Sequence, residues 1–481
     1  MVGCSLVVVV GCGDDAATSA SAASTTSVSG VDPTSGGSGG ASVPTTTDGG
    51  EGTASGGGTT ASTTVGTLDT SATGPATDAG TTVVTATTSG SATSGTTVGL
   101  DDSGTGGSSS GEPAMDLPSE GCDVKCGNTD WSYVWIANSG ENTLSKLDTR
   151  NMTEEGRYFT RPDQQGSPSR TSVSIDGKAV AVANRSGGIT KVWAREEYCS
   201  DKNGNGVIDT SSGKNDVLAF DVEECIAWYT PFAGATTQRP IAWTSGVYNT
   251  DNCEYEEQKI WTAASYGNGD ACNGADGVHV YRLNGDTGEV EDTVHLPDVP
   301  CGLLGAYGAA VDADNNAWFF VFGGGLIFRV DHETLAHEVV YKGFYGITVD
   351  TKSRVWLDDG SRYDPVTKQW ALQIGDLQPN GGSGVAQDLK GRIWHATNGG
   401  IGWLDAETMV VGGKVILPNQ GLARGIGVDV DGYIWAVILG GTVAYRIHPD
   451  TFEIASYDGL NMPYTYSDMA GGQINNVICP Q

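Results

Sequence analysis

Two neighbouring stretches decide the fold: Gly346-Ile347-Thr348-Val349-Asp350 and, after a short turn, Arg354-Val355-Trp356-Leu357. Two runs of β-branched and apolar residues on either side of a turn are typical of a β-hairpin. The same pattern returns along the chain, with Trp six residues after Asp and with roughly 40 residues between copies. Its clearest instances are Asp312…Trp318, Asp350…Trp356, Asp388…Trp394 and Asp429…Trp435.

A third strand follows each hairpin and ends in a turn of the Asp-x-x-Thr type. The Asp side chain at such a turn can accept hydrogen bonds from backbone N–H groups two residues further on. The turns are Leu147-Asp148, Asp331…Thr334, Asp364…Thr367, Asp405…Thr408 and, with His in place of Asp, His448…Thr451. A fourth strand completes the unit, so each repeat is predicted to form one four-stranded blade of a β-propeller.

Seven copies are predicted, with the Trp-equivalent positions 135, 181, 261, 318, 356, 394 and 435. The first copy lacks its leading strand, whereas the segment Tyr464–Gly471 near the chain end has no hairpin partner of its own. A ring must close, because an open blade leaves an unpaired sheet edge. The chain is therefore predicted to be an all-β, seven-bladed propeller over residues 121–481, closed by its C-terminal strand. The repeated Asp and Trp residues are expected to be structural.

The N-terminal quarter of the chain has a different composition. Residues 13–120 are dominated by Thr, Ser, Gly and Ala and contain no aromatic residue, which predicts a disordered linker. Residues 1–12 resemble a bacterial lipoprotein signal, with Val9-Val10-Gly11 as the lipobox and Cys12 as the lipidated residue. That resemblance implies a lipid-anchored protein of the cell envelope, in the outer membrane.

Eight cysteines remain after Cys4 and Cys12 are set aside, and an even number in an exported protein suggests disulfides. Cys199 and Cys225 bracket an insertion in blade 2 at about residues 195–228. Cys272 and Cys301 are expected in loops on one face of the propeller. Cys479 is expected near Cys122 and Cys126, where a disulfide would lock the ring.

Residues 201–209 have the spacing of a calcium-binding loop. Oxygen ligands would come from Asp201, Asn203, Asn205 and Asp209, with the carbonyl of Val207 and with Gly206 at the sharp turn. Position 12 of the loop is Ser212 rather than an acidic residue, for which Asp216, Asp221 or Glu223 would substitute. The expectation is a structural Ca²⁺, and the alternative is a surface turn rich in Asn and Gly. The net charge of −32 suits a cationic partner and argues against nucleic-acid binding.

A ligand is expected on the face where loops enter the innermost strands. Several entry positions carry Tyr or Arg, and polar residues begin the next loops on that face; the alternative is that these residues only surround a water-filled channel. The predicted ligand-binding residues are Arg170, Arg239, Tyr307, Tyr345, Asp359, Asn398 and Arg424. His395 is the one weak catalytic candidate, because His279 and His295 fall in outer strands.

The units 346–357 and 384–395 resemble the repeats of virginiamycin B lyase-type and NHL-like seven-bladed propellers. The lyases use a metal-assisted His and acidic residues on the funnel face, whereas the corresponding positions here carry Asn138, Asn184, Asp359 and Thr397. The first hypothesis is thus a binding or scaffolding module for a small molecule, peptide, glycan or envelope protein. The alternatives are a lyase acting on a cyclic peptide or glycan at the funnel, and a calcium-dependent structural surface protein.

Overall fold

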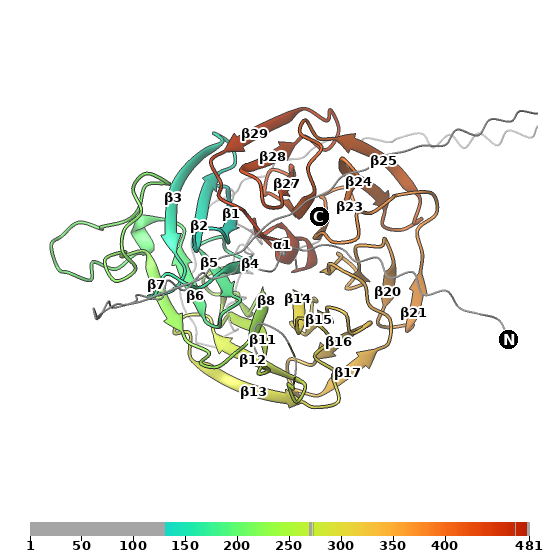
Figure 1. Cartoon of the computed structure of the whole chain (residues 1–481), viewed down its shortest axis with the longest axis horizontal. Coiled ribbons are helices and arrows are strands. Elements are labelled where there is room, and N and C mark those ends of the chain that lie inside the picture. Colours follow the sequence, from blue (N-terminus) through green and yellow to red (C-terminus); the bar gives the residue numbers. More distant parts are fainter. Residues whose placement is uncertain (1–129, 269–271, 273, 467, 479–481) are drawn as a thin grey trace, which may run out of the picture. The chain divides into compact units, whose positions relative to one another are not determined.

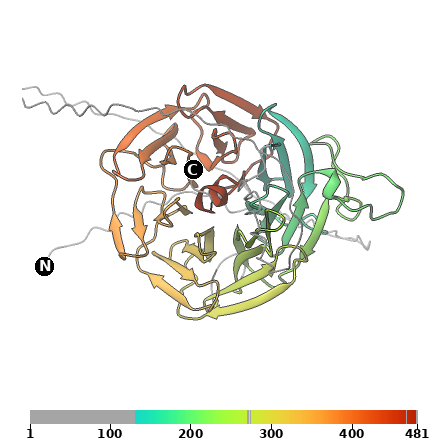
Figure 2. The same ribbon diagram turned by 180° about the vertical axis from the view of Figure 1, so that it is seen from behind.

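The computed structural model describes residues 130–268, 272, 274–466 and 468–478, and these form a ring of seven antiparallel sheets (Figures 1 and 2). The predicted seven-bladed propeller is confirmed. The N-terminal segment 1–12 with Cys12, the linker 13–120, Cys122, Cys126 and Cys479 lie outside the described residues. Among the described residues, no helix has the length and apolar character needed to cross a bilayer.

In blades 2 to 7 the strands follow one another in chain order from the innermost strand to the rim. Blade 1 contains β1 (Tyr133–Asn138), β2 (Thr143–Asp148) and β3 (Thr153–Phe159). Blade 2 contains β4 (Pro168–Val173), β5 (Ala179–Asn184), β6 (Ile189–Trp193) and β7 (Ile226–Thr230). Blade 3 contains β8 (Thr237–Trp243), β11 (Lys259–Ser265), β12 (Val278–Asn284) and β13 (Val290–Leu296). A separate hairpin of β9 (Val247–Asn249) and β10 (Glu254–Glu256) connects β8 to β11.

The second half of the ring follows the same plan. Blade 4 contains β14 (Ala306–Val311), β15 (Ala317–Val321), β16 (Leu326–Val330) and β17 (His337–Val340). Blade 5 contains β18 (Thr348–Val349), β19 (Val355–Trp356), β20 (Arg362–Asp364) and β21 (Gln369–Ala371). Blade 6 contains β22 (Val385–Gln387), β23 (Arg392–Thr397), β24 (Gly400–Asp405) and β25 (Val411–Ile416). Blade 7 contains β26 (Ala423–Val428), β27 (Ile434–Ile438), β28 (Val443–Ile447) and β29 (Ile454–Asp458).

The ring closes through the C-terminal segment, as predicted. The N–H of Trp135 donates to the carbonyl of Met469 (2.8 Å), and the N–H of Tyr464 donates to the carbonyl of Ala137 (3.0 Å). A β-bridge pairs Asn138 with Pro463. The residues 463–466, 468 and 469, called the closing strand below, therefore supply the missing innermost strand of blade 1 and remove an open sheet edge.

A short helix, α1 (Gly472–Ile478), follows the closing strand and was not predicted. It lies at the centre of the ring in both views (Figures 1 and 2), against the innermost strands of blades 5, 6 and 7. The carboxylate of Asp468 accepts the N–H groups of Gln473 and Ile474 (3.1 Å each), which satisfies donors that a helix start leaves open. The buried Ile474 and Val477 then cover the channel where the innermost strands end.

The insertion in blade 2 is shorter than expected. It occupies residues 194–225, between β6 and β7, because Trp228 pairs with Lys191 inside the sheet. Apart from the one-turn 3₁₀ helix Glu196–Tyr198, it is irregular, and it projects from the rim of the ring (Figure 1).

Candidate functional site

Arginine and tyrosine side chains from several blades meet at the centre of the ring, near the starts of the innermost strands. This arginine–tyrosine cluster consists of Arg170 on β4, Arg185 after β5, Arg239 on β8, Tyr307 on β14, Tyr345 before β18, Arg424 on β26, and Tyr464 and Tyr466 on the closing strand.

β-bulges direct several of these side chains inward. Pairing of β14 with β15 skips Tyr307, and pairing of β26 with β27 skips Arg424. The extra residue of a bulge leaves the ladder, which bends the strand and re-aims the side chain. Gly425 follows Arg424, and a Cβ there would collide with the carbonyl of Thr465 on the closing strand. Glycine thus allows β26 to pass close to the strand that closes the ring.

Cation–π contacts hold the cluster together. The guanidinium carbon of Arg170 lies 3.2 Å from the ring centre of Tyr466 and 4.7 Å from that of Tyr307. Arg185 lies 4.3 Å from the ring centre of Tyr464, and Arg424 lies 5.0 Å from that of Tyr345. Arg170 is fully buried, whereas Arg185, Arg424 and Tyr464 are partly exposed at the opening of the cluster. The contacts of Arg170 with Tyr466 and Tyr307 are desolvated, and such contacts contribute about 2 kcal/mol each.

The phenolic oxygen of Tyr464 is the meeting point of this network. It is hydrogen-bonded to the hydroxyls of Tyr307 and Tyr345, the latter at 2.9 Å. Burial opposes ionisation of Tyr464, but the guanidinium groups of Arg170, Arg424 and Arg239 outweigh burial and lower its pKa to about 8. The pKa values of Tyr307 and Tyr345 are raised by burial, so these two phenols remain hydrogen-bond donors. The site is thus arranged around one phenolic oxygen whose ionisation the surrounding arginines favour.

Positive charge exceeds negative charge at this point. None of the ion pairs between described residues includes Arg170, Arg185 or Arg424. Within the described part of the chain, Nε and Nη2 of Arg170 and Nε of Arg424 have no hydrogen-bond partner. Buried donors without partners are costly, so these groups are suited to an additional acceptor.

A second buried group lies in blades 5 and 6. The hydroxyl of Ser383 donates to Asp358 (2.6 Å), and Nδ1 of His395 lies 3.9 Å from the same carboxylate. Burial raises the pKa of Asp358 to about 7 and lowers the pKa of His395 to about 3. Ser383 bonds directly to the carboxylate rather than to the imidazole, so the three residues do not have the order of a Ser-His-Asp nucleophile.

The predicted ligand-binding residues divide into two sets. Arg170, Arg239, Tyr307, Tyr345 and Arg424 come together in the cluster. The other two belong to turns. Asp359 accepts hydrogen bonds from Ser361, and Asn398 is exposed after β23.

Sequence reasoning missed Arg185, Tyr464 and Tyr466 as site residues. A signal for the two tyrosines was present in the sequence. Residues two apart on a strand share a face, so Tyr464 and Tyr466 of the closing strand must point the same way.

The funnel positions Asn138 and Asn184 make hydrogen bonds within the protein. The amide Nδ2 of Asn138 donates to Ser145 (2.7 Å), and that of Asn184 donates to the carbonyl of Thr160 (2.9 Å). Asn138 thus joins β1 to β2 within blade 1, and Asn184 joins the end of β5 to the segment that follows β3. Neither nitrogen of His395, which is fully buried, has a hydrogen-bond partner among the described residues.

The loop 201–209 is held by hydrogen bonds to the carboxylates of Asp201 and Asp209. Asp201 accepts the N–H groups of Gly204 (2.6 Å) and Gly206 (2.8 Å), and the amides of Asn203 and Asn205 both reach Oδ2 of Asp209. Glycine permits the positive φ of +73° and +84° at positions 204 and 206. The side chains of Asn203 and Asn205 thus meet Asp209 through their amide nitrogens, and the loop carries the oxygen-bearing residue types that Ca²⁺ prefers.

Buried glutamates hold this loop to the blade. Glu224 accepts the N–H groups of Lys202 (2.7 Å) and Asp209 (2.9 Å). Glu223, a predicted substitute for the acidic position 12, instead accepts the N–H groups of Ser211 and Cys225. Asp216 accepts the hydroxyl of Ser212.

Two predicted disulfides are present. Cys199–Cys225 closes the insertion at its base. Cys272–Cys301 joins the loop after β11 to the loop that leads into β14. Both loops of the second disulfide lie on the face that carries the arginine–tyrosine cluster, as expected.

The fold and its centre define the class of protein: a seven-bladed β-propeller whose channel is filled by arginine and tyrosine. Neither a family model nor a curated protein matches the chain. Among solved structures, it is similar to a streptogramin B lyase (19% identity, 47% of this chain and 70% of that chain, TM-score 0.37). It is also similar to a catalytically inactive virginiamycin B lyase from Staphylococcus aureus with quinupristin (15% identity, 60% and 84%, TM-score 0.42). A third similar structure is AztD from Citrobacter koseri (11% identity, 70% and 96%, TM-score 0.43).

Proposed function

We propose that this protein is a binding module that holds a carboxylate- or phosphate-bearing ligand at the opening of the arginine–tyrosine cluster. The observation that carries the proposal is the gathering of Arg170, Arg185 and Arg424 around phenolic oxygens, with no carboxylate ion-paired to any of the three among the described residues. Guanidinium groups bind carboxylate and phosphate through parallel, charge-assisted hydrogen bonds.

The geometry also supports one direction of approach for the ligand. Arg185 and Arg424 are partly exposed and both contact the ring of Tyr464, at 4.3 and 5.5 Å from guanidinium carbon to ring centre. α1 covers the opposite end of the channel. A ligand would therefore approach from the face of the loop entries and place its anionic group between the two arginines, with its remainder against tyrosine rings.

Titration calorimetry with inorganic phosphate and with citrate tests the proposal on the full chain. Binding of either probe is expected, with an at least tenfold weaker affinity in Arg424→Gln and in Arg185→Gln. Arg195→Gln is the matched control, because Arg195 is exposed and paired with Glu197 (3.2 Å). Absence of binding by both probes, or unchanged affinity in Arg424→Gln, would refute the proposal.

Catalysis at the same cluster is the second candidate function. The lowered pKa of Tyr464 favours it, because a phenol that ionises near neutral pH is suited to act as a general base. A lyase-type elimination on a cyclic peptide or glycan would then depend on Tyr464. Turnover of such a substrate that persists in Tyr464→Phe would exclude this role.

We also propose a structural Ca²⁺ in the loop 201–209, held by Asp201, Asn203, Asn205, Asp209 and the carbonyl of Val207. The spacing of oxygen-bearing residues and the compact folding of the loop around Asp201 and Asp209 support it. Ca²⁺ is expected to raise the melting temperature of the full chain and to leave that of Asp201→Ala unchanged. An equal shift in both would contradict the assignment.

The lipobox-like residues and the long polar linker support a lipid-anchored protein of the cell envelope, in the outer membrane. Metabolic labelling with a fatty acid tests this placement. Label that depends on Cys12 is expected, and label retained in Cys12→Ser would contradict it.

A further inference from the structure

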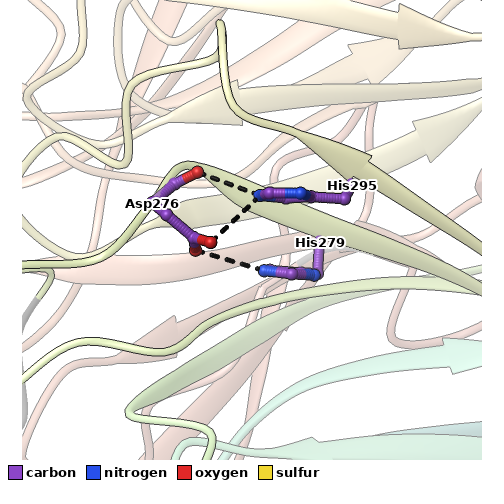
Figure 3. A group of neighbouring side chains, drawn as sticks. All are labelled: Asp276, His279 and His295. Carbon is purple, nitrogen blue, oxygen red and sulfur yellow. Dashed lines mark hydrogen bonds and ion pairs between the residues drawn. The ribbon is translucent and has the colours of Figure 1, made fainter.

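Blade 3 carries a group of side chains that neither the fold nor the central cluster uses. We propose that Asp276, His279 and His295 form a binding site for one divalent transition-metal ion of the Zn²⁺ type. The three residues lie at the start of β12 and the end of β13 (Figure 3), on the same face of the ring as the arginine–tyrosine cluster.

The ligand atoms already lie close to one another. Nε2 of His279 is 3.4 Å from Oδ1 of Asp276, and Nε2 of His295 is 3.4 Å from Oδ2 of the same carboxylate. One ligand atom from each residue can be chosen so that all three lie within 4.8 Å of one another. Figure 3 shows both imidazoles presenting the same edge to the carboxylate.

Strand pairing brings the two histidines together. His279 and His295 are directly opposite in the register of β12 and β13, and their rings stack with centres 4.2 Å apart. The ring of Tyr266 meets His279 edge-on at 5.1 Å, which fixes that imidazole on one side. His295 is more exposed (41% of its side chain, against 20% for His279), so it can rotate toward an ion.

Gly277 places the carboxylate above this pair. Its φ is +110°, and a Cβ at this position would collide with the carbonyl of Leu296 at the end of β13. Only glycine lets the chain pass so close to the neighbouring strand in that conformation. Asp276 is thereby held over the end of the hairpin rather than pointing away from it.

The donor set selects the kind of ion. Two imidazole nitrogens and one carboxylate oxygen suit Zn²⁺, Co²⁺ or Ni²⁺, with water at the open position. Ca²⁺ and Mg²⁺ prefer oxygen ligands, so this site is chemically distinct from the loop 201–209.

A metal ion at this site would also restrain the neighbouring loops. Asp276 belongs to the segment between Cys272 and β12, and the disulfide Cys272–Cys301 joins this segment to the loop that leads to Tyr307. An ion bound here would tie that segment to the β12–β13 hairpin. The inference does not depend on the proposed function, because no residue is shared between the two sites.

Titration of the full chain with Co²⁺ tests the proposal. Co²⁺ reports its ligands by its absorption spectrum, so a site with imidazole and carboxylate ligands is distinguished from one with cysteine thiolates. One ion per chain is expected, and Zn²⁺ should displace it while excess Ca²⁺ should not. Affinity should fall at least tenfold in each of His279→Gln, His295→Gln and Asp276→Asn.

His337→Gln is the matched control, because His337 is also paired with an aspartate, Asp298, at 2.9 Å on the neighbouring blade. It should bind Co²⁺ like the unaltered chain. The ligand residues are at least partly exposed, so melting curves of the metal-free variants should coincide with that of the unaltered chain. Failure of the full chain to bind Co²⁺, or unchanged binding in His279→Gln and His295→Gln, would overturn the proposal.

Discussion

The indole nitrogen of Trp356 donates a 2.8 Å hydrogen bond to Oδ2 of Asp350, and both side chains are fully buried. Oδ1 of the same aspartate accepts the N–H groups of Lys352 and Arg354 in the hairpin turn. One carboxylate thus fixes the turn and the blade-packing tryptophan together. The same bond recurs between Trp318 and Asp312, Trp394 and Asp388, and Trp435 and Asp429.

Replacement of Asp350 with Asn should destabilise the protein by about 1–3 kcal/mol, because a buried acceptor shared by an indole and a guanidinium is lost. Urea unfolding followed by tryptophan fluorescence measures this. Asp364→Asn, in an exposed turn, is the control and should cost less than about 1 kcal/mol. Equal losses in the two variants would show that the Trp–Asp bond is dispensable.

A single tyrosine should ionise near pH 8, and Tyr464→Phe should remove that titration. Spectrophotometric titration of phenolate measures it, with Tyr133→Phe as the control, because burial raises the pKa of Tyr133 to about 12. Arg424→Gln should raise the pKa of Tyr464, because a nearby positive charge favours the phenolate. A pH 8 titration retained in Tyr464→Phe would contradict the structure of the cluster.

The lowered pKa of Tyr464 should make the free energy of unfolding depend on pH. The folded pKa of Tyr464, about 8, lies below its ordinary value of 10.0, so Tyr464 stabilises the fold increasingly as pH rises from about 8 to 10. That contribution is fully present above pH 10 and is lost as pH falls through 8. In urea unfolding at a series of pH values, Tyr464→Phe is expected to lack this increment, whereas Tyr133→Phe should keep it.

Removal of the Tyr466 side chain should weaken the closure of the propeller. Tyr466→Ala is expected to cost about 3–5 kcal/mol, because the buried ring packs against Arg170, Tyr307 and Tyr345. The exposed Tyr341 is the control, and Tyr341→Ala should change the free energy of unfolding by less than about 0.5 kcal/mol. A small effect of Tyr466→Ala in urea unfolding would mean that the closing strand contributes little to stability.

Glu224 should govern calcium affinity without being a ligand, because it holds the backbone of the loop at Lys202 and Asp209. Glu224→Gln is expected to weaken Ca²⁺ binding about tenfold in calorimetry, as for other residues that orient ligands. Glu197→Gln, an exposed change near the same loop, should leave the affinity unaltered. Loss of binding in Glu197→Gln alone would place the ion elsewhere.

Much of the fold was predictable because its signals are short-range. The Asp–Trp spacing corresponds to one hydrogen bond inside one hairpin, so each blade can be recognised from a segment of a few residues. The closing strand was predictable because blade 1 lacks a strand that the chain end supplies. The insertion in blade 2 lies between β6 and β7, and Trp228 belongs to β7 rather than to the insertion.

The candidate sites were less predictable, because they join residues from different blades or strands. Strand entries identified Tyr345 and Arg424. The next loops on the same face pointed to Asp359, whereas the buried carboxylate there belongs to the preceding residue, Asp358. His279 and His295 were assigned to outer strands, but nothing in their spacing gave the register that makes them neighbours.

The amino-acid sequence by itself determined the seven blades, the closing strand and the bonding pattern of each hairpin, since these depend on backbone periodicity and on contacts a few residues apart. Only the tertiary structure decided which side chains share the channel, that α1 covers one end of it, and that Asp276 stands over two histidines. Those relationships depend on how the ring brings separate strands together, on bulges that re-aim side chains, and on glycines that permit close approach.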